Sequence, residues 1–141
     1  MSDATRLSRS GWDQGYAIGI ATAAGVCNLL RLSTEETAHA VGIAAASNLP
    51  LRVTRSGELT SWKNVATAYA ARNGLFAALL AAEGMAGPGN AFDGRNGLWE
   101  KVTGPFELAP FPNEGGAYLM PRVQLKYWPI ETNGQAAVWA A

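Results

Sequence analysis

Three stretches rich in alanine and glycine, each with helical periodicity, constrain the fold of this chain more than any other feature. They cover residues 15–31, 34–47 and 65–83 of the 141-residue sequence. Apolar residues recur along them at the spacing of one helix face. Small side chains let helix axes approach closely. We therefore expect a mainly α fold in which these helices are surrounded by other helices.

Start and stop signals delimit the predicted helices. Ser33 and Glu36 have the spacing of a capping box, and Gly84 can supply a left-handed cap after the third helix. Residues 48–62, between the second and third helices, have the composition of a loop and a length typical of functional loops. This loop leads directly to Lys63.

The periodicity also predicts which side chains face the interior. The first helix should bury a stripe of apolar residues and one threonine, and the second helix should bury a short stripe of valine and alanine. The third helix should bury a row of large apolar side chains. These predicted inward residues are Ile18, Thr22, Val26 and Leu29 or Leu30 in the first helix, Val41 and Ala44 or Ala45 in the second, and Val65, Tyr69, Phe76, Leu79 and Leu80 in the third.

The sequence changes character after residue 87. Residues 90–106 favour a turn and a short helix, and the segment 108–116, rich in proline and glycine, is typical of a hinge. Residues 117–129 have partial strand character, limited by a proline to an edge or interrupted strand. A last helix starts near residue 131 and reaches the end of the sequence without a cap or breaker, which indicates a truncated chain.

Charge and cysteine content exclude several classes of protein. Eleven basic residues balance eleven acidic ones without forming a block, which argues against a nucleic-acid or lipid-surface partner. The single cysteine, Cys27, can form no disulfide framework and can hold no iron–sulfur cluster. The polar N-terminus has no signal core, and Gly, Asn or Arg interrupts each of the most apolar later stretches before a membrane span is complete. We expect a soluble, cytoplasmic protein.

Self-sufficient catalytic motifs are missing from the sequence. It contains no phosphate-binding loop, no Gly-x-Ser-x-Gly elbow and no cluster of ligands with metal-binding spacing. The single histidine, His39, lies between alanines in the second helix, so we interpret it as a helix-face residue rather than a general base.

Lys63 is the first candidate for a functional residue. It opens the third helix, where unpaired backbone amides and the positive end of the helix dipole favour an anion. An ammonium group adds a mobile charge suited to a carboxylate. The alternative is a surface lysine, for which this position is slightly unfavourable. We predict that Lys63 binds an anionic substrate.

Lys126, Asp13 and Gln14 are the other candidates. Lys126 lies between aromatic residues and a proline that stiffens the following turn, so its side chain can point into a cleft or extend to the surface. Asp13 and Gln14 directly precede the first helix. There, capping the amide of Gly15 is the alternative to a role in binding.

Five segments together resemble the MmgE/PrpD family, which comprises 2-methylcitrate dehydratase-like enzymes and cis-aconitate decarboxylases. The segments are GWDQG at 11–15, LLRLSTEETAHAVGIAAAS, SWKNVATAYAARNGLFAALLAAEGMAGP, FDGRNGLW and KYWPIETNGQAAVWAA. Their order and spacing both fit, over nearly the whole chain from Gly11 onward.

The resemblance implies part of an all-helical bundle domain over residues 1–104, then a hinge and the start of a small α+β lid domain over 105–141. It also implies a dimeric enzyme of propionate catabolism that acts on small di- or tricarboxylates without a metal or organic cofactor. Lys63 and Lys126 would bind substrate carboxylates and stabilise the charge that builds up when a neighbouring proton is removed. Asp13 or Gln14 lies where some members carry a histidine.

The resemblance further implies that the chain matches the middle of the enzyme. In the family, a segment that supplies acid and base groups lies upstream of the matched region, and most of the lid lies downstream. We therefore expect no turnover by this chain alone. The parent reaction would be dehydration, with decarboxylation or epimerisation as alternatives within the family. A non-catalytic helical module that associates through its exposed faces is the alternative from another class.

Overall fold

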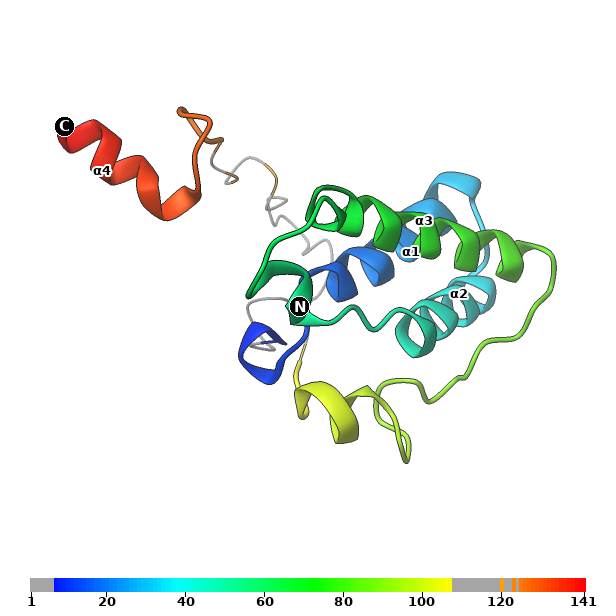
Figure 1. Ribbon diagram of the computed structural model, residues 1–141. Coiled ribbons are helices and arrows are strands. Elements are labelled where there is room, and N and C mark those ends of the chain that lie inside the picture. Colours follow the sequence, from blue (N-terminus) through cyan, green and yellow to red (C-terminus); the bar gives the residue numbers. More distant parts are fainter. Residues whose placement is uncertain (1–6, 108–119, 121–122, 124) are drawn as a thin grey trace. The chain divides into compact units, whose positions relative to one another are not determined.

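The computed structural model describes residues 7–107, 120, 123 and 125–141 (Figure 1). The chain separates into two compact units, Met1–Leu108 and Ala109–Ala141, which we call unit 1 and unit 2. In the described residues, unit 1 contains the long helices α1, α2 and α3, and unit 2 contains the short helix α4. The described part of the chain is mainly helical and contains no strand, which confirms the predicted mainly α class.

Helix α1 spans Gly15–Leu30 and ends at a left-handed residue that is not glycine. Arg31 has φ 58° and ψ 37°, and its backbone amide donates to the carbonyl oxygens of Asn28 and Cys27. The next amide, of Leu32, also donates to the Cys27 carbonyl oxygen at 3.0 Å. These bonds pair carbonyls that the helix end leaves free and turn the chain sharply toward α2.

Helix α2 spans Thr34–Ser47 and begins with the predicted capping box. The Ser33 hydroxyl accepts a hydrogen bond from the Glu36 amide at 3.2 Å, and Glu36 Oε2 accepts one from the Ser33 amide at 2.7 Å. Each bond satisfies an amide that the helix start leaves unpaired. Hydrogen bonds to Ser33, through its side chain first and its backbone second, hold the pKa of Glu36 below its ordinary value.

Helix α3 spans Trp62–Ala82 and runs in the same direction as α1, whereas α2 runs in the opposite direction (Figure 1). The contact between α1 and α3 is so close that it requires glycine. A Cβ atom placed on Gly74 would lie 2.1 Å from the carbonyl oxygen of Gly19, and one on Gly19 would lie 3.3 Å from the carbonyl oxygen of Ala70. The two helix backbones therefore touch, as small residues allow.

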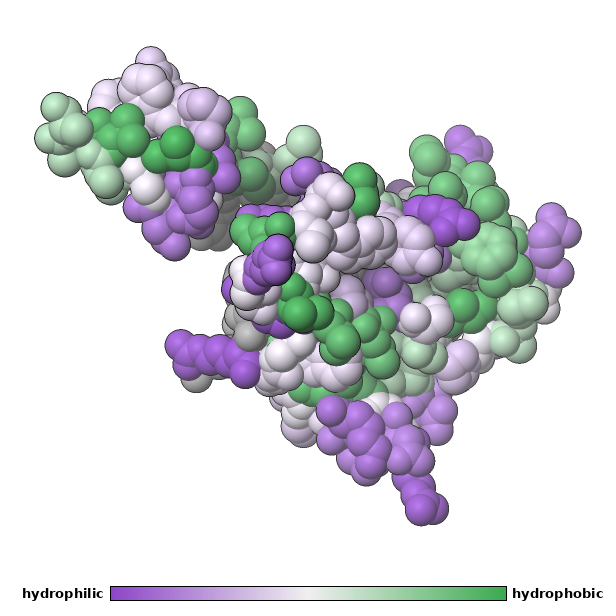
Figure 2. Space-filling model, in the orientation of Figure 1, coloured by the Kyte–Doolittle hydropathy of each residue, from purple (hydrophilic) through white to green (hydrophobic). Residues whose placement is uncertain are grey.

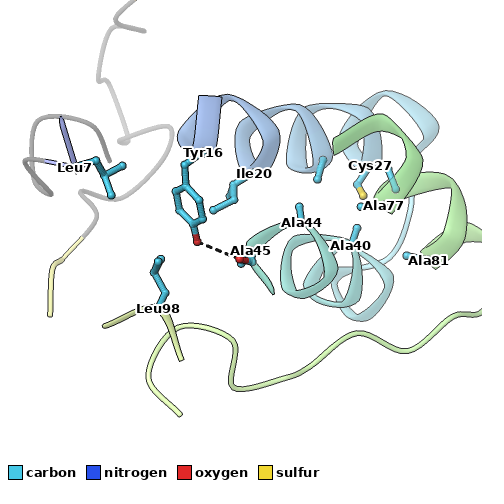
Figure 3. Packing of buried hydrophobic residues seen from close by; sticks show 12 residues of the cluster. Leu7, Tyr16, Ile20, Cys27, Ala40, Ala44, Ala45, Ala77, Ala81 and Leu98 are labelled. Carbon is cyan, nitrogen blue, oxygen red and sulfur yellow. Dashed lines mark hydrogen bonds between the residues drawn. The ribbon is translucent and has the colours of Figure 1, made fainter. Parts of the chain in front are cut away.

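Alanine forms most of the interior of unit 1. Figure 3 shows Tyr16 of α1 pointing toward Ala45 of α2, whose carbonyl oxygen accepts a hydrogen bond from the Tyr16 hydroxyl at 3.4 Å. Burial raises the pKa of Tyr16. The buried residues of the three helices are Gly15, Tyr16, Gly19, Ile20, Ala23 and Cys27 of α1, Ala40, Gly42, Ala44 and Ala45 of α2, and Ala66, Ala70, Gly74, Ala77, Ala78 and Ala81 of α3.

The predicted inward face of α3 is wrong for four of its five residues, and the fifth, Leu80, is half-buried. Phe76 is 60% exposed, and Val65, Tyr69 and Leu79 are each more than 40% exposed. The helix instead turns its alanines inward, because only small side chains fit where the backbones approach this closely. Large apolar side chains consequently reach the molecular surface (Figure 2).

The predicted inward face of α1 is wrong at Leu29 and Leu30, whereas Val26 packs against the core. Leu29 is 80% exposed, and Ile18, Thr22 and Val26 are only half-buried. The buried stripe lies one position around the helix and includes Gly15 and Gly19. In α2 the prediction is confirmed for Ala44 and Ala45, and the half-buried Val41 packs against the core.

Three shorter helices complete the described part of unit 1, and the first of them, η1, spans Leu7–Ser10. The loop after α2 contains a 3₁₀ helix, η2, at Arg52–Arg55, which packs against α3. Gly84 has φ 86° and gives α3 the predicted left-handed end. The chain then crosses α2 so closely that a Cβ on Gly42 would lie 2.5 Å from the carbonyl oxygen of Pro88. It continues to η3, Trp99–Thr103, the short helix expected within residues 90–106.

Unit 2 is held together by one glutamine and three aromatic rings. A 3₁₀ helix, η5, at Thr132–Gly134 leads into α4, Gln135–Ala140. The Gln135 amide group accepts from the Trp128 backbone amide at 3.0 Å and donates to its carbonyl oxygen at 2.9 Å. The rings of Tyr127, Trp128 and Trp139 pack together with centroids 5.1 to 6.1 Å apart.

The hinge predicted at 108–116 lies outside the described residues. The strand predicted at 117–129 lies partly outside them, and the residues described there form no strand.

By length and hydropathy, α3 is the one described helix that could cross a membrane. Its alanine face packs against both α1 and α2 within unit 1. This packing is typical of the central helix of a globular domain.

Candidate functional site

Asp13 is completely buried at the start of α1, where two hydrogen bonds occupy its carboxylate. Oδ1 accepts from the Gly15 backbone amide at 2.9 Å, and Oδ2 accepts from Nε of Arg55 at 2.6 Å. The cap on Gly15, which the sequence left as the alternative role of Asp13, is therefore present in the structure. The same carboxylate also forms an ion pair, which the sequence did not predict.

The segment after α2 delivers Arg55 to Asp13. The Asp13 amide donates to the Pro50 carbonyl oxygen at 2.8 Å, and the Arg52 amide donates to the Gly11 carbonyl oxygen at 2.9 Å. Trp12 and Leu51 form an isolated antiparallel bridge between the same two segments. The chain that precedes α1 is thus paired with the chain that enters η2, and Arg55 lies at the end of η2.

The guanidinium group of Arg55 is only partly satisfied. Its side chain is 18% exposed. Nη2 is fully covered, yet it has no hydrogen-bond acceptor among the residues that the structure describes. Sequence reasoning missed Arg55 because its partner is 42 positions away along the chain. The sequence shows two arginines in this loop, Arg52 and Arg55, but nothing that assigns either of them to Asp13.

Lys63 lies in the first turn of α3 and is half-buried. Its backbone amide donates to the Thr60 carbonyl oxygen at 3.1 Å. Within residues 7–107, its ammonium group makes no hydrogen bond or ion pair. This ammonium can therefore accept an anionic partner.

Helix register places Lys63 at the same end of the α1–α3 pair as Asp13. Residues seven apart in a helix share a face, so Lys63 lies on the stripe of Ala70. Ala70 contacts Gly15 at the start of α1, since a Cβ on that glycine would lie 3.3 Å from the Ala70 Cβ. Because α1 and α3 run in the same direction, Lys63 lies about two turns further out, beyond the start of α1.

Gln14 and Lys126 complete the predicted set. Gln14 is exposed directly after Asp13, and its side chain does not cap α1. Lys126 belongs to unit 2, where it is exposed beside Tyr127. The structure brings Asp13, Gln14 and Lys63 to one end of unit 1. The prediction that Lys126 acts on the same substrate stays a prediction.

A cavity of about 320 Å³ lies elsewhere in unit 1, between the end of α2 and η3. None of the four predicted residues lines it. Its walls include Ala45, Leu49 and Leu98, with Arg95 and Lys101 also contributing. Lys101 is paired with Glu100 at 2.5 Å, and this contact holds the pKa of Glu100 below its ordinary value. Across the described residues, no group of three or more His, Cys, Asp or Glu could hold a metal ion.

Comparison with known proteins identifies the family. The sequence profile of the MmgE/PrpD N-terminal domain matches residues 1–110. The cis-aconitate decarboxylase-like protein oryM of Aspergillus oryzae (strain ATCC 42149 / RIB 40) is 44% identical over 94 residues, which are 66% of this chain and 19% of that protein. The alkylcitrate dehydratase phiI of Fungal sp. (strain ATCC 74256) is 34% identical over 136 residues, 93% of this chain and 26% of that protein.

The chain spans about a fifth to a quarter of the length of these two relatives. No solved structure gives a significant match. The family profile nevertheless covers more than two thirds of the chain, and it includes both ends of the Asp13–Arg55 pair and Lys63. The chain therefore belongs to the MmgE/PrpD family, as its five sequence segments had indicated.

Proposed function

We propose that this chain is part of a cofactor-independent lyase that acts on a small tricarboxylate such as 2-methylcitrate. The parent reaction is a dehydration, in which a proton next to a carboxylate is removed and the β-hydroxyl group leaves. The observation that carries the proposal is the position of Lys63, half-buried and without an anionic partner within residues 7–107, in a chain of this family. The printed name of one relative, an alkylcitrate dehydratase, supports the choice of reaction.

The cationic side chains have a defined role in this mechanism. When the proton leaves, negative charge builds on the neighbouring carboxylate, and a cation fixed against that carboxylate stabilises the transition state more than the ground state. We assign this role to Lys63 and Lys126. Gln14, exposed beside the start of α1, can donate a hydrogen bond to the same substrate. The acid and base groups belong to other parts of the enzyme, so we expect binding without turnover.

Decarboxylation is the alternative reaction, and the name of the other relative, a cis-aconitate decarboxylase-like protein, favours it. Both reactions place negative charge next to a carboxylate, and the same lysines would serve in each. We also propose a soluble, cytoplasmic homodimer without nucleic-acid or membrane partners. The balanced charge and the exposed apolar side chains of unit 1 support this proposal.

A non-catalytic helical module remains a second candidate, favoured by the exposure of Phe76 and Leu29. Ligand binding separates the two functions. Citrate, 2-methylcitrate and cis-aconitate are titrated against the 141-residue chain while its thermal unfolding is followed. A ligand at 100 times its Kd stabilises the folded state by about 2.7 kcal/mol, which raises the melting temperature of a chain this size by roughly 10 °C.

Two lysine variants test the assignment. Lys63→Gln and Lys126→Gln should each reduce the ligand-induced shift. Lys101→Gln is the matched control, because Lys101 is exposed and already paired with Glu100. If none of the three acids shifts the melting temperature of the wild-type chain, the helical module is the better description. The oligomeric state is measured separately by light scattering.

A further inference from the structure

The guanidinium group of Arg55 has donors that the described part of the chain does not use. An arginine side chain carries five N–H donors, and here Nε donates one of them to Asp13. Nη2, on the same edge of the group, is covered but has no acceptor within residues 7–107. A covered donor on a charged group is costly to leave unpaired. An acceptor for Nη2 is therefore expected from outside this set of residues.

Asp13 does not accept from Nη2 in the structure. Its Oδ1 is engaged by the Gly15 amide and its Oδ2 by Arg55 Nε, and the side chain is completely buried. An acidic group in this position would also repel the carboxylates of a substrate. By accepting from Nε, the Asp13 carboxylate instead fixes the orientation of the guanidinium group.

We propose that Arg55 binds a carboxylate of the substrate through Nη2, and that Asp13 is the positioning residue that holds it. The inference rests on the proposed function, because it names a further binding residue for the same class of substrate. Asp13, which was predicted from the sequence to bind the substrate itself, would then act on the substrate only through Arg55. A planar guanidinium group suits a carboxylate better than any other side chain does.

The position of Arg55 fits this role. η2 packs against α3, and only the short segment 56–62 separates Arg55 from Lys63. The bond to Asp13 places Arg55, and helix register places Lys63, at the end of unit 1 where α1 begins. Asp13, Arg55 and Lys63 together carry a net charge of one positive unit, so the cluster can accept an anion. Two separate cations also match the two or three carboxylates of the proposed substrate.

The segment that follows η2 is the part of unit 1 that would have to move for a carboxylate to reach the covered Nη2. Residues 56–61 are all exposed. Gly57, with φ 71°, gives this segment a left-handed turn. Because the segment buries no side chain, it can shift to admit a carboxylate without breaking core contacts.

The test compares three acids that differ by one carboxylate. Tricarballylate is the probe, glutarate lacks its central carboxylate, and methylsuccinate lacks a terminal one. Calorimetry gives the Kd of each acid for the wild-type chain and for Arg55→Lys, which keeps the charge but loses Nη2. Arg52→Lys, in the same 3₁₀ helix, is the matched control.

We expect Arg55→Lys to weaken tricarballylate binding about 10- to 100-fold, the value of one charge-assisted hydrogen bond. The dicarboxylate that lacks the carboxylate bound by Arg55 should lose little. Arg52→Lys should change nothing. An equal loss of affinity for all three acids would mean that Arg55 is only structural and would overturn the inference. An unchanged Kd for tricarballylate would also overturn it. In both cases the proposed function would stand.

Two other outcomes are a wild-type chain that binds none of the acids and an Arg55→Lys variant that does not fold. A wild-type chain that binds none of the acids would overturn the proposed function, and this inference with it. If Arg55→Lys does not fold, isotope-labelled arginine in the wild-type chain gives the answer by NMR. Tricarballylate should then shift the Arg55 side-chain nitrogen signals and leave those of Arg52 in place. Unshifted Arg55 signals in a chain that binds the acid would contradict the proposal.

Discussion

Replacing Gly74 with alanine should push α1 and α3 apart. The new Cβ would lie 2.1 Å from the carbonyl oxygen of Gly19 and 3.0 Å from the Cβ of Thr22. The nearest obstacle is backbone, which cannot rotate away as a side chain could. The Cβ and the oxygen would therefore have to move apart by about 1.3 Å, from 2.1 Å to the 3.4 Å at which ordinary packing begins.

The expected loss of stability follows from three terms. Overpacking of this kind costs about 1–3 kcal/mol, and a rigid obstacle places Gly74→Ala near the upper value. A gap of 0.5–1 Å along the rest of the seam forfeits about a quarter to a half of each dispersion contact. Against these losses, alanine favours the helix over glycine by about 1 kcal/mol. The net destabilisation should be about 2 kcal/mol or more.

Gly25→Ala is the matched control for this measurement. Gly25 lies on α1, is exposed, and a Cβ there would have no atom within 4 Å. Only the helix preference acts at this site, so Gly25→Ala should stabilise the chain by about 0.5–1 kcal/mol. Urea denaturation followed by circular dichroism measures both variants. A Gly74→Ala chain as stable as the wild type would refute the close contact.

Three further predictions concern stability and reactivity. Asp13→Asn and Arg55→Met should each cost about 3 kcal/mol, because the first leaves the mostly buried Arg55 and the second the completely buried Asp13 without its charged partner. The double variant should cost less than the sum of the two losses, and additive losses in urea denaturation would contradict the ion pair. Ser33→Ala should cost about 1 kcal/mol. Because Ser33 lowers the pKa of Glu36 in the folded chain, the stability that this pair adds is complete above the ordinary glutamate pKa and is lost as the pH falls through the lowered value. Ser33→Ala should therefore flatten the acid side of the stability profile, and an unchanged slope would argue against the box. Burial raises the pKa of the Cys27 thiol, so a thiol reagent should label the native chain slowly and the urea-unfolded chain fast; rapid native labelling would show that this part of the core is open.

Local signals in the sequence predicted the helix boundaries well. The capping box at Ser33 and Glu36 and the left-handed end at Gly84 depend on residues within four positions of each other. Lys63 was placed at the start of a helix by the same kind of signal. Such features require no knowledge of the rest of the fold.

Features that depend on tertiary packing were predicted less well. The expected interior of α3 assumed that large apolar residues such as Phe76 face inward, but contact between Gly19 and Gly74 leaves room only for alanine along the seam. The Asp13–Arg55 pair was missed because nothing in the sequence links two residues so far apart. The role of Lys126 depends on how substrate is bound, which no local pattern can specify.

An interior built from alanine changes the thermodynamics of unfolding. Each alanine removes little apolar surface from water, while side chains such as Phe76 and Leu29 are already hydrated in the folded chain. The heat capacity change of unfolding and the denaturant m value both scale with newly exposed area. The heat capacity change and the m value should both be small for a chain of 141 residues. The free energy of folding should therefore vary only gently with temperature, and the denaturant unfolding transition should be broad.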